Sequence, residues 1–399
     1  MKRLLFLSLL TSSAALADDA KPLVTFDAHH RLRFESGGNK DLKDNDRMEA
    51  FGQAVRLGAR FDLADWVTLV ARFQDVRAWG AEPNTLTVGG NVMDLHEGYI
   101  ALTPWTGVTL EAGRRTWAYD DERIIGTVGW ALQERRFDGG RVRLLLGGVE
   151  GDLFYAKLAE PDTLAPNGNN DTDLVGLHAT YKFSSYVASL LAVADFDDTD
   201  DKERKRATAG LFFRGTPGMF KVRLEGYAQL GKVGDEDLLA FFAGGEFGVV
   251  LKEVAAASVT LGADFLSGDD KPAEGKIKSF DTMFGTNHKF YGLMDFFTAF
   301  PKDTGGRGLL DAWARLGADP MANLNVAATY HLFRLATKDD KDDSALGHEI
   351  DLEVGWSPIK QLRIYGGGGV MLPGASLKNL KGGNDDMEVW AFIQTDVRM

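Results

Sequence analysis

Apolar and polar residues alternate along most of the chain, and the stretch from Val108 to Leu146 shows this pattern clearly. From Val108 to Arg115 every second residue is apolar, and the residues between are polar or small. After a long connection the alternation resumes at Arg141, where arginines again take the polar positions. A period of two is typical of a β-strand with one apolar face and one polar face.

The same rule, applied from end to end, predicts about eighteen strands and an all-β fold. The predicted strands are residues 22–36, 47–63, 66–78, 92–103, 107–117, 140–147, 151–159, 172–183, 185–196, 206–215, 218–231, 237–251, 256–267, 307–318, 321–335, 347–357, 360–371 and 387–399. Abundant glycine and aromatic residues, with few prolines, favour a closed antiparallel sheet over a helical protein.

The connections between these strands alternate between short turns and long polar loops. Short turns are expected near residues 63–65, 104–107, 147–150, 184–185, 215–217, 252–255, 319–320 and 357–359. Long loops are expected at residues 37–46, 118–139, 160–171, 197–205, 267–306, 336–346 and 373–387. This parity is typical of a single transmembrane antiparallel β-barrel in the outer membrane of a Gram-negative bacterium, with short periplasmic turns and long extracellular loops. Trp66, Trp105, Tyr186 and Trp356 lie beside the short turns, as expected of an aromatic girdle.

Alternate residues of a strand lie on opposite faces of the sheet. In one predicted strand, Phe220 and Val222 share one face and Lys221 and Arg223 share the other, which indicates which face contacts lipid. An Arg or Lys side chain at the bilayer midplane costs about 2–4 kcal/mol, so the charged face is predicted to line a wet lumen. With about eighteen strands the interior is too wide for side chains to fill, and an aqueous channel remains.

The N-terminus has a basic start, an apolar run over residues 4–10 and an A-x-A site at residues 15–17. We therefore expect residues 1–17 to be a signal peptide and residues 18–399 to form one β-barrel domain. No stretch approaches the roughly 18 consecutive apolar residues of a transmembrane helix. The net charge of −13 argues against nucleic acid as a partner, and the lack of cysteine excludes disulfides.

Arginine is frequent on the predicted inward face of the first three strands and of the fifth and sixth, whereas the sixteenth predicted strand carries Glu349, Asp351 and Glu353. The inward arginines proposed to contact a substrate are Arg56, Arg60, Arg72, Arg115, Arg141 and Arg143. Arginine rings select anions in pores, and the guanidinium fork binds carboxylates and phosphates. A second interpretation stays open, in which lumenal arginines and carboxylates only pair across strands and stiffen the wall.

Several motifs, in order along the chain, resemble those of the alginate export family of outer-membrane β-barrel porins. They are QDVRAW at 74–79, DLHEGY at 94–99, GRR at 113–115, DDERIIG at 120–126 with Trp130, RFDG at 136–139 and FDTMFGTNHKFYGLMD at 280–295. The resemblance implies an eighteen-stranded barrel whose arginine-lined constriction passes an anionic uronate polymer. It implies pore or substrate roles at the matching positions Arg77, Glu97, Arg114, Arg123, Arg136, Asp138, His288 and Asp295. Strand parity places Arg114 on the outward face, so a role in the pore requires a bulge near Gly113.

These features predict a passive outer-membrane channel for anionic saccharides, with membrane lipid and periplasmic export proteins as further partners. A general or small-carboxylate porin is the first alternative. A barrel enzyme is a second, although the sequence has no G-x-S-x-G or H-E-x-x-H motif and we predict no enzymatic activity. A receptor that acts through its loops is a third.

No cofactor or metal is expected. The acidic runs at residues 197–201 and 339–343 lack the Asp-x-Asp-Gly spacing of a calcium loop and are interpreted as solvated tips. The loop from Phe280 to Phe300 is rich in aromatic residues, which would lie in water if the loop pointed outward. We therefore expect this loop to fold into the lumen and narrow the pore.

Overall fold

The computed structural model describes residues 23–38, 42, 48–81, 93–159, 171–198, 203–270, 275–338, 343–384 and 386–399. The predicted signal peptide and most of the two acidic runs lie outside these residues. The strands are β1 (Val24–Gly37), β2 (Met48–Ala64), β3 (Val67–Ala78), β4 (Asp94–Trp105), β5 (Val108–Arg115), β6 (Phe137–Leu146), β7 (Val149–Ala159), β8 (Thr172–Phe183), β9 (Tyr186–Asp197), β10 (Arg204–Gly215), β11 (Phe220–Val233), β12 (Glu236–Leu251), β13 (Ala257–Leu266), β14 (Lys276–Ile277), β15 (Leu309–Met321), β16 (Leu324–Arg334), β17 (Ala345–Ile359), β18 (Leu362–Pro373) and β19 (Glu388–Arg398).

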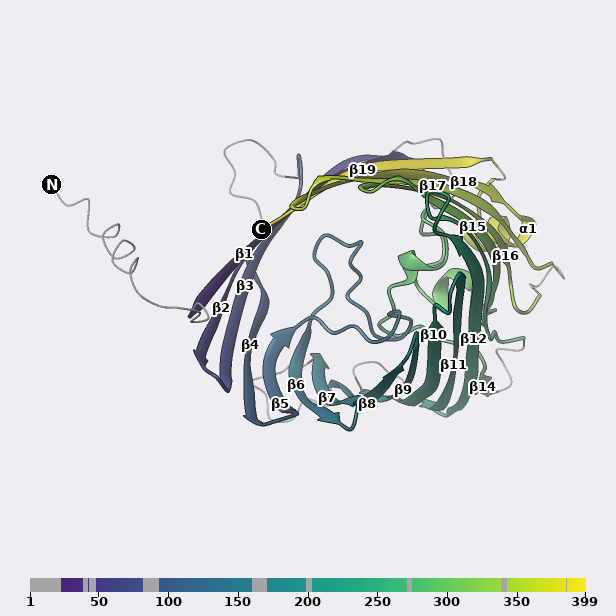
Figure 1. Ribbon diagram of the computed structural model, residues 1–399. Coiled ribbons are helices and arrows are strands. Elements are labelled where there is room, and N and C mark those ends of the chain that lie inside the picture. The colour runs from purple at the N-terminus through teal and green to yellow at the C-terminus, as the bar shows by residue number, and fades with distance from the viewer. Residues whose placement is uncertain are drawn as a thin grey trace.

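Eighteen of these strands form a closed antiparallel barrel, in which each pairs with its neighbour in sequence and β19 pairs with β1 (Figure 1). All the predicted strands are present, and their ends differ from the predicted ends by at most three residues. The short strand β14 was not predicted; it runs parallel to β12 at the barrel rim. None of the described helices is long and apolar enough to cross a bilayer. The predicted barrel is confirmed.

As predicted, the short turns lie at one end of the barrel and the long loops at the other, with one exception. Turns of two to five residues join β2 to β3, β4 to β5 and so on around one end of the barrel. The other end carries the long loops, one of which contains the helix α1 (Ala375–Lys381) and another the short 3-10 helices η1 (Asn287–Lys289) and η2 (Lys302–Thr304). The exception is the link of two residues between β11 and β12, which lies at the long-loop end. Gly234 there has a φ of 58°, a left-handed conformation that glycine adopts without strain.

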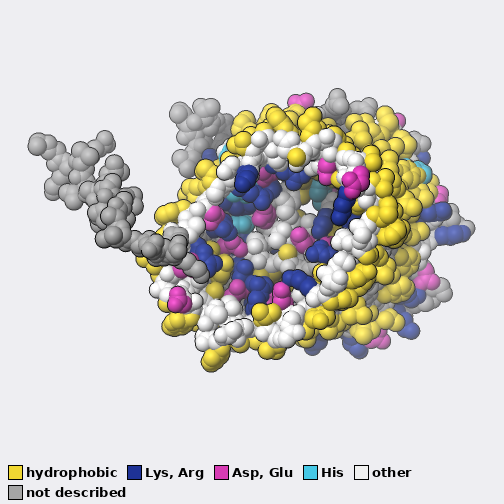
Figure 2. Space-filling model, in the orientation of Figure 1, with side chains coloured by type: hydrophobic (Ala, Val, Ile, Leu, Met, Phe, Trp, Pro, Cys, Tyr) yellow, Lys and Arg dark blue, Asp and Glu magenta, His cyan; other side chains and the backbone are white. Residues whose placement is uncertain are grey.

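The outer face of the barrel is apolar and its inner face is charged. Figure 2 shows hydrophobic side chains around the outside and a hollow lined by Lys, Arg, Asp and Glu side chains. Leu57, Leu211 and Leu352 are each about 60 % exposed or more, which is the expected position for lipid contact. Trp66 and Trp105 beside the short turns are also exposed, consistent with an aromatic girdle.

Strand β7 departs from the predicted facing. The apolar-out rule assigned Tyr155 and Lys157 to the lumen, but Phe154 is 3 % exposed while Tyr155 is 47 % exposed. Phe154 packs inward against the rings of Trp117 and Tyr119. The rule fails here because a loop inside the lumen supplies an apolar surface to the inner face of β7.

Two long connections fold into the barrel and form what we term the plug, residues 116–136 and 278–300. Figure 1 shows both inside the ring. They join through a parallel bridge between Ile125 and Phe284. Tyr291, Phe296 and Phe297 are at most 1 % exposed, so the predicted inward folding of the loop from Phe280 is confirmed. The plug packs with inward apolar residues near the long-loop ends of the strands, and this half of the lumen contains the main apolar core.

Candidate functional site: the plug and the chamber beneath it

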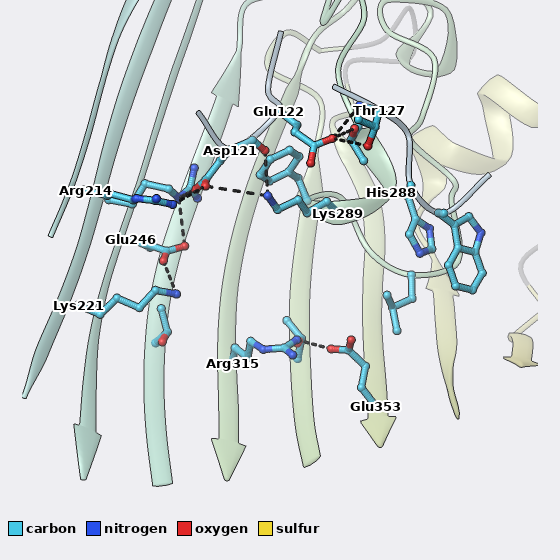
Figure 3. A pocket seen from close by; sticks show the side chains of 18 of the residues that line it. Asp121, Glu122, Thr127, Arg214, Lys221, Glu246, His288, Lys289, Arg315 and Glu353 are labelled. Atoms are coloured by element: carbon cyan, nitrogen blue, oxygen red, sulfur yellow. Dashed lines mark hydrogen bonds and ion pairs between the residues drawn. The ribbon is translucent and has the colours of Figure 1, made fainter. Parts of the chain in front are cut away.

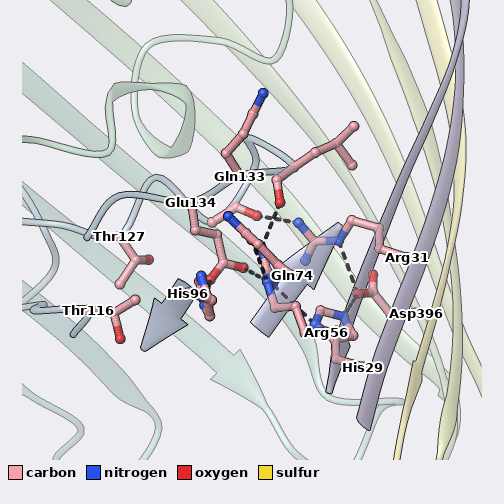
Figure 4. A network of polar contacts seen from close by, with 12 residues as sticks. His29, Arg31, Arg56, Gln74, His96, Thr116, Thr127, Gln133, Glu134 and Asp396 are labelled. Atoms are coloured by element: carbon pink, nitrogen blue, oxygen red, sulfur yellow. Dashed lines mark hydrogen bonds and ion pairs between the residues drawn. The ribbon is translucent and has the colours of Figure 1, made fainter. Parts of the chain in front are cut away.

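One side of the lumen binds the plug through guanidinium groups. We call Arg31 and Arg33 of β1 and Arg56 of β2 the arginine wall. Arg31 donates to the carbonyl of Gly129, Arg33 to that of residue 130 and Arg56 to that of residue 132, each over 2.6 Å. Figure 4 shows Arg31 and Arg56 in this network. A hydrogen bond from a charged donor contributes roughly 1.5–3 kcal/mol. The arginine wall therefore fixes the first plug loop by its backbone.

Another part of the lumen wall, formed by β13, β15 and β17, binds the second plug loop through carboxylates. We call Asp264 of β13, Asp311 of β15, and Glu349 and Asp351 of β17 the acid wall; all four are at most 2 % exposed. The N–H of residue 294 donates to Glu349 over 2.9 Å, and that of residue 293 donates to Asp351 over 3.2 Å. His331 donates toward Asp311 over 3.0 Å. The two walls thus use opposite charges to bind opposite groups of the plug backbone.

Arg123 connects the first plug loop to the acid wall. Its guanidinium is fully buried and lies 2.9 Å from Glu225, 3.0 Å from Asp264 and 2.9 Å from the hydroxyl of Tyr291. Phe290 covers it, with the ring centroid 3.5 Å away. Burial opposes the charge, but Asp264 and Glu225 outweigh it and raise the pKa of Arg123 well above its usual value. Arg123 therefore stays charged and acts as a buried anchor.

A chamber of about 1350 Å³ lies beneath the plug and reaches the short-turn end of the barrel. Plug residues including Trp130, His288 and Lys289 form its inner end, and Ser184, Thr216 and Gln361 of the turns lie at its mouth. Its lining holds ten cationic side chains, Arg31, Lys182, Arg214, Lys221, Arg223, Lys289, Arg315, Lys360, Arg363 and Arg398. It holds seven acidic ones, Asp121, Glu122, Glu246, Asp264, Asp351, Glu353 and Asp396. Lys and Arg outnumber Asp and Glu here, although the whole chain has 45 of the former and 58 of the latter.

Many of the chamber cations face carboxylates across the lumen or along a strand. Figure 3 shows Arg214 and Lys221 on the wall, opposite Lys289 of the plug. Lys221 lies 2.7 Å from Glu246, and Lys289 donates to a plug carbonyl over 3.0 Å. Among the described residues, no carboxylate lies within ion-pair distance of Lys360 or Arg363. These two cations at the chamber mouth keep their charge available to a solute.

Most of the predicted pore arginines face the lumen but are paired with carboxylates. The pairs are Arg60 with Asp62, Arg72 with Asp27 and Glu97, Arg115 with Glu111, Arg141 with Glu111 and Asp152, Arg143 with Asp152, and Arg56 with Glu134. Arg136, next to β6, lies 2.7 Å from Asp94. The interpretation of wall stiffening, left open above, accounts for these contacts directly.

Arg77, Arg114 and Asp138 lie elsewhere. Arg114 and Asp138 are opposite each other on β5 and β6, and their side chains meet at 2.6 Å. The pairing of β5 continues without a register shift through Gly113, so the bulge that would turn Arg114 inward is not formed. Alternation then places both side chains on the outward face, near the long-loop end. Arg77 has the same parity as the exposed Phe73 and pairs with Asp75 over 2.6 Å.

Of the residues predicted for the site, His288 is the one that lines the chamber. Its Nδ1 lies 2.6 Å from Asp295, and its ring stacks on Trp130 with centroids 4.2 Å apart. Sequence reasoning did not select the chamber cations of β8, β10 and β18 or Lys289 as site residues. Strand parity alone placed Lys221 and Arg363 inward, but their position beneath the plug depends on where the loops fold.

Among the described residues, no cluster of three or more His, Asp or Glu side chains is arranged to bind a metal. The closed barrel with an apolar exterior, a charged lumen and an inward plug defines an outer-membrane channel of a Gram-negative bacterium. Residues 23–391 match the model of the alginate export family, and the chain belongs to that family. It therefore belongs with channels and not with enzymes.

Solved structures with the same fold come from Pseudomonas aeruginosa. The outer membrane protein OpdK is 13 % identical, with a TM-score of 0.63, and the match covers 94 % of this chain and 98 % of OpdK. OpdO is 15 % identical, with a TM-score of 0.62 over 94 % and 97 % of the two chains. OpdK solved with vanillate is 12 % identical, with a TM-score of 0.60 over 94 % and 98 %. No curated protein sequence matches the chain significantly.

Proposed function

We propose that the protein is a passive channel for anionic saccharides, possessing a cation-rich chamber that concentrates acidic sugars beneath the plug. The excess of Lys and Arg in the chamber lining carries this proposal, because it opposes the acidic balance of the whole chain. Charged side chains lining a narrow, low-dielectric passage raise the local concentration of counter-ions. Membership of the alginate export family supports a uronate polymer or its fragments as the solute.

The cations of β10 and β11 are the part of the lining that we expect to select anions. Arg214 and Lys221 have about half of their side-chain surface exposed, so a solute can reach them. The arginine wall is occupied with the plug backbone and contributes mainly to the background field. We expect the substrate carboxylates to meet the chamber cations first and the plug afterwards.

Reversal potentials across a planar bilayer under a KCl gradient test the proposal. We expect the native channel to favour chloride, and the double variant R214Q/K221Q to lose at least half of that preference. The matched control is R114Q, whose side chain is on the outward face, and it should keep the native selectivity. Cation selectivity in the native channel would overturn the proposal.

A small-carboxylate porin is the second candidate. It is favoured by the fold shared with OpdK, which has been solved with vanillate. The chamber is large enough for a single aromatic acid, and the same cations would bind it. Liposome swelling assays with sodium vanillate and with a uronate trisaccharide separate the two candidates, because a general anion porin admits the smaller solute much faster.

A further inference from the structure

We infer that the chamber contains a ring-stacking ledge on which the sugar rings of an acidic saccharide dock, formed by Tyr365 and by His288, with Trp130 stacked behind the His288 ring. The inference rests on the proposed function and names the part of the chamber that recognises the rings. All three side chains line the chamber. Two come from the plug, and Tyr365 comes from the inward face of β18.

The plug part of the ledge is rigid. The guanidinium of Arg33 lies 3.8 Å from the ring centroid of Trp130, which also stacks with the ring of His288. Asp295 fixes the orientation of His288 through its Nδ1. Phe392 meets Trp130 edge-on, with the centroids 4.8 Å apart. Because Arg33 and His288 both stack on Trp130, the ring that the plug offers to the chamber is that of His288. This ring is already held in place, so binding a sugar does not incur the entropy cost of ordering it.

The wall part of the ledge continues from the plug to the chamber mouth. Phe392 also meets the ring of Tyr365 at 5.0 Å, so it connects the two parts from behind. The guanidinium of Arg363 lies 4.9 Å from the centroid of Tyr365. From the mouth to the plug, the groups are therefore the cation Arg363, the ring of Tyr365 and the ring of His288.

This order fits a linear chain of acidic pyranose rings. The C–H groups on one face of a pyranose carry partial positive charge, which the negative face of an aromatic ring attracts. A carboxylate on each ring can meet Arg363 or Lys360 while the ring stacks. A single aromatic acid would use one ring position and leave the other empty, whereas an oligosaccharide uses both.

The test measures how long a uronate trisaccharide blocks single channels in a planar bilayer. In the variant Y365L we expect the residence time to fall about five- to tenfold, because an aromatic contact is lost. Y365F keeps the ring and should retain the native residence time. Y330L removes a tyrosine from the outward face of β16 and should also behave as the native channel. Unblocked conductance reports whether each variant has folded.

Each outcome decides one part of the inference. A native residence time in a folded Y365L channel overturns the ledge while leaving the anionic channel intact. Longer block by vanillate than by the trisaccharide, with the same dependence on Tyr365, overturns the assignment to saccharides. Cation selectivity without block in the native channel overturns the proposed function itself. As a second variant, R363Q should shorten block by the trisaccharide and leave any weak block by neutral maltotriose unchanged.

Discussion

The arginine wall and the acid wall bind the same plug in opposite ways. Arg31, Arg33 and Arg56 donate to plug carbonyls and also meet carboxylates, so their donors are largely used. In the acid wall, one oxygen of Glu349, one of Asp351 and Oδ1 of Asp264 are buried without a hydrogen-bond partner among the described residues, and Oδ2 of Asp264 meets Arg123 as an ion pair. A wall of arginines can satisfy carbonyls and carboxylates together, because a guanidinium has five donors. A wall of carboxylates needs cations or protons from elsewhere.

The comparison separates the charges that build the channel from those that remain for a solute. The arginines that were most prominent in the sequence bind the plug or pair with acids on adjacent strands. The cations that line the chamber come largely from the strands after β7 and from the plug itself. Arginine content of a strand is therefore a poor guide to where a substrate binds; exposure of the side chain to the chamber and position beneath the plug are better guides.

The largest loss of stability is expected on substitution of Arg123, the buried anchor that connects the first plug loop to the acid wall. The variant R123Q leaves Asp264 buried without its cation and removes one of the two cations of Glu225, the other being Arg223. This change should cost about 3–5 kcal/mol of stability. Thermal unfolding in detergent and single-channel conductance would show a lower midpoint and a larger, noisier pore. R123K keeps a charge but loses the forked geometry, and should fall between native and R123Q. Native stability of R123Q would show that the anchor is not needed.

A smaller effect is expected where each wall contacts its own loop. R56M leaves the carbonyl of residue 132 unpaired, and E349L leaves the N–H of residue 294 unpaired; each loss costs about 1–3 kcal/mol. E349L should lose less stability than R56M, because removing Glu349 also removes its electrostatic repulsion with Asp351. Amide hydrogen exchange at residue 294 should rise in E349L. An equal rise there in R56M would contradict independent attachment of the two loops.

The smallest effect is expected at Arg60, near the turn between β2 and β3. Its side chain is 53 % exposed and lies 2.8 Å from Asp62. An exposed ion pair contributes at most about 1 kcal/mol and is screened by salt. R60Q should unfold at nearly the native denaturant concentration, and the difference should vanish at high ionic strength. A loss as large as that of R56M would mean that the arginines of the two positions have equivalent structural roles.

The strands could be predicted from the sequence because alternation is local. The apolar and polar faces of each strand are visible within about ten residues of sequence. They recur around the whole barrel because every strand contacts lipid on one side and the wet lumen on the other. Phe154 is instructive, because its inward position depends on Trp117 of the plug and not on its own strand. The family motifs marked Arg123 as important, but its role depends on Glu225, which is 102 residues away in sequence.

Gly113 is a second position whose structural role could not be predicted from the sequence. A role of Arg114 in the pore, implied by the family resemblance, required a bulge near Gly113, and the φ of this glycine, 129°, is indeed unusual. A Cβ at this position would lie 2.2 Å from the carbonyl oxygen of Gly98, so close backbone approach explains the glycine. The pairing of β4, β5 and β6 keeps its register there, and Arg114 stays outward. The sequence shows that a glycine is present, but it does not show whether the glycine forms a bulge or allows close approach of two backbones.

The seam between β1 and β19 joins the first and last strands of the barrel. Met399 and Ala28 exchange two backbone hydrogen bonds across it, and His29 bonds to Asp396, 367 positions later. The pairing of β19 with β1 and β18 closes the ring, so that none of the eighteen barrel strands is left with an unpaired edge. Loss of β19 would leave β1 and β18 as two unpaired edges and expose the interior of the barrel.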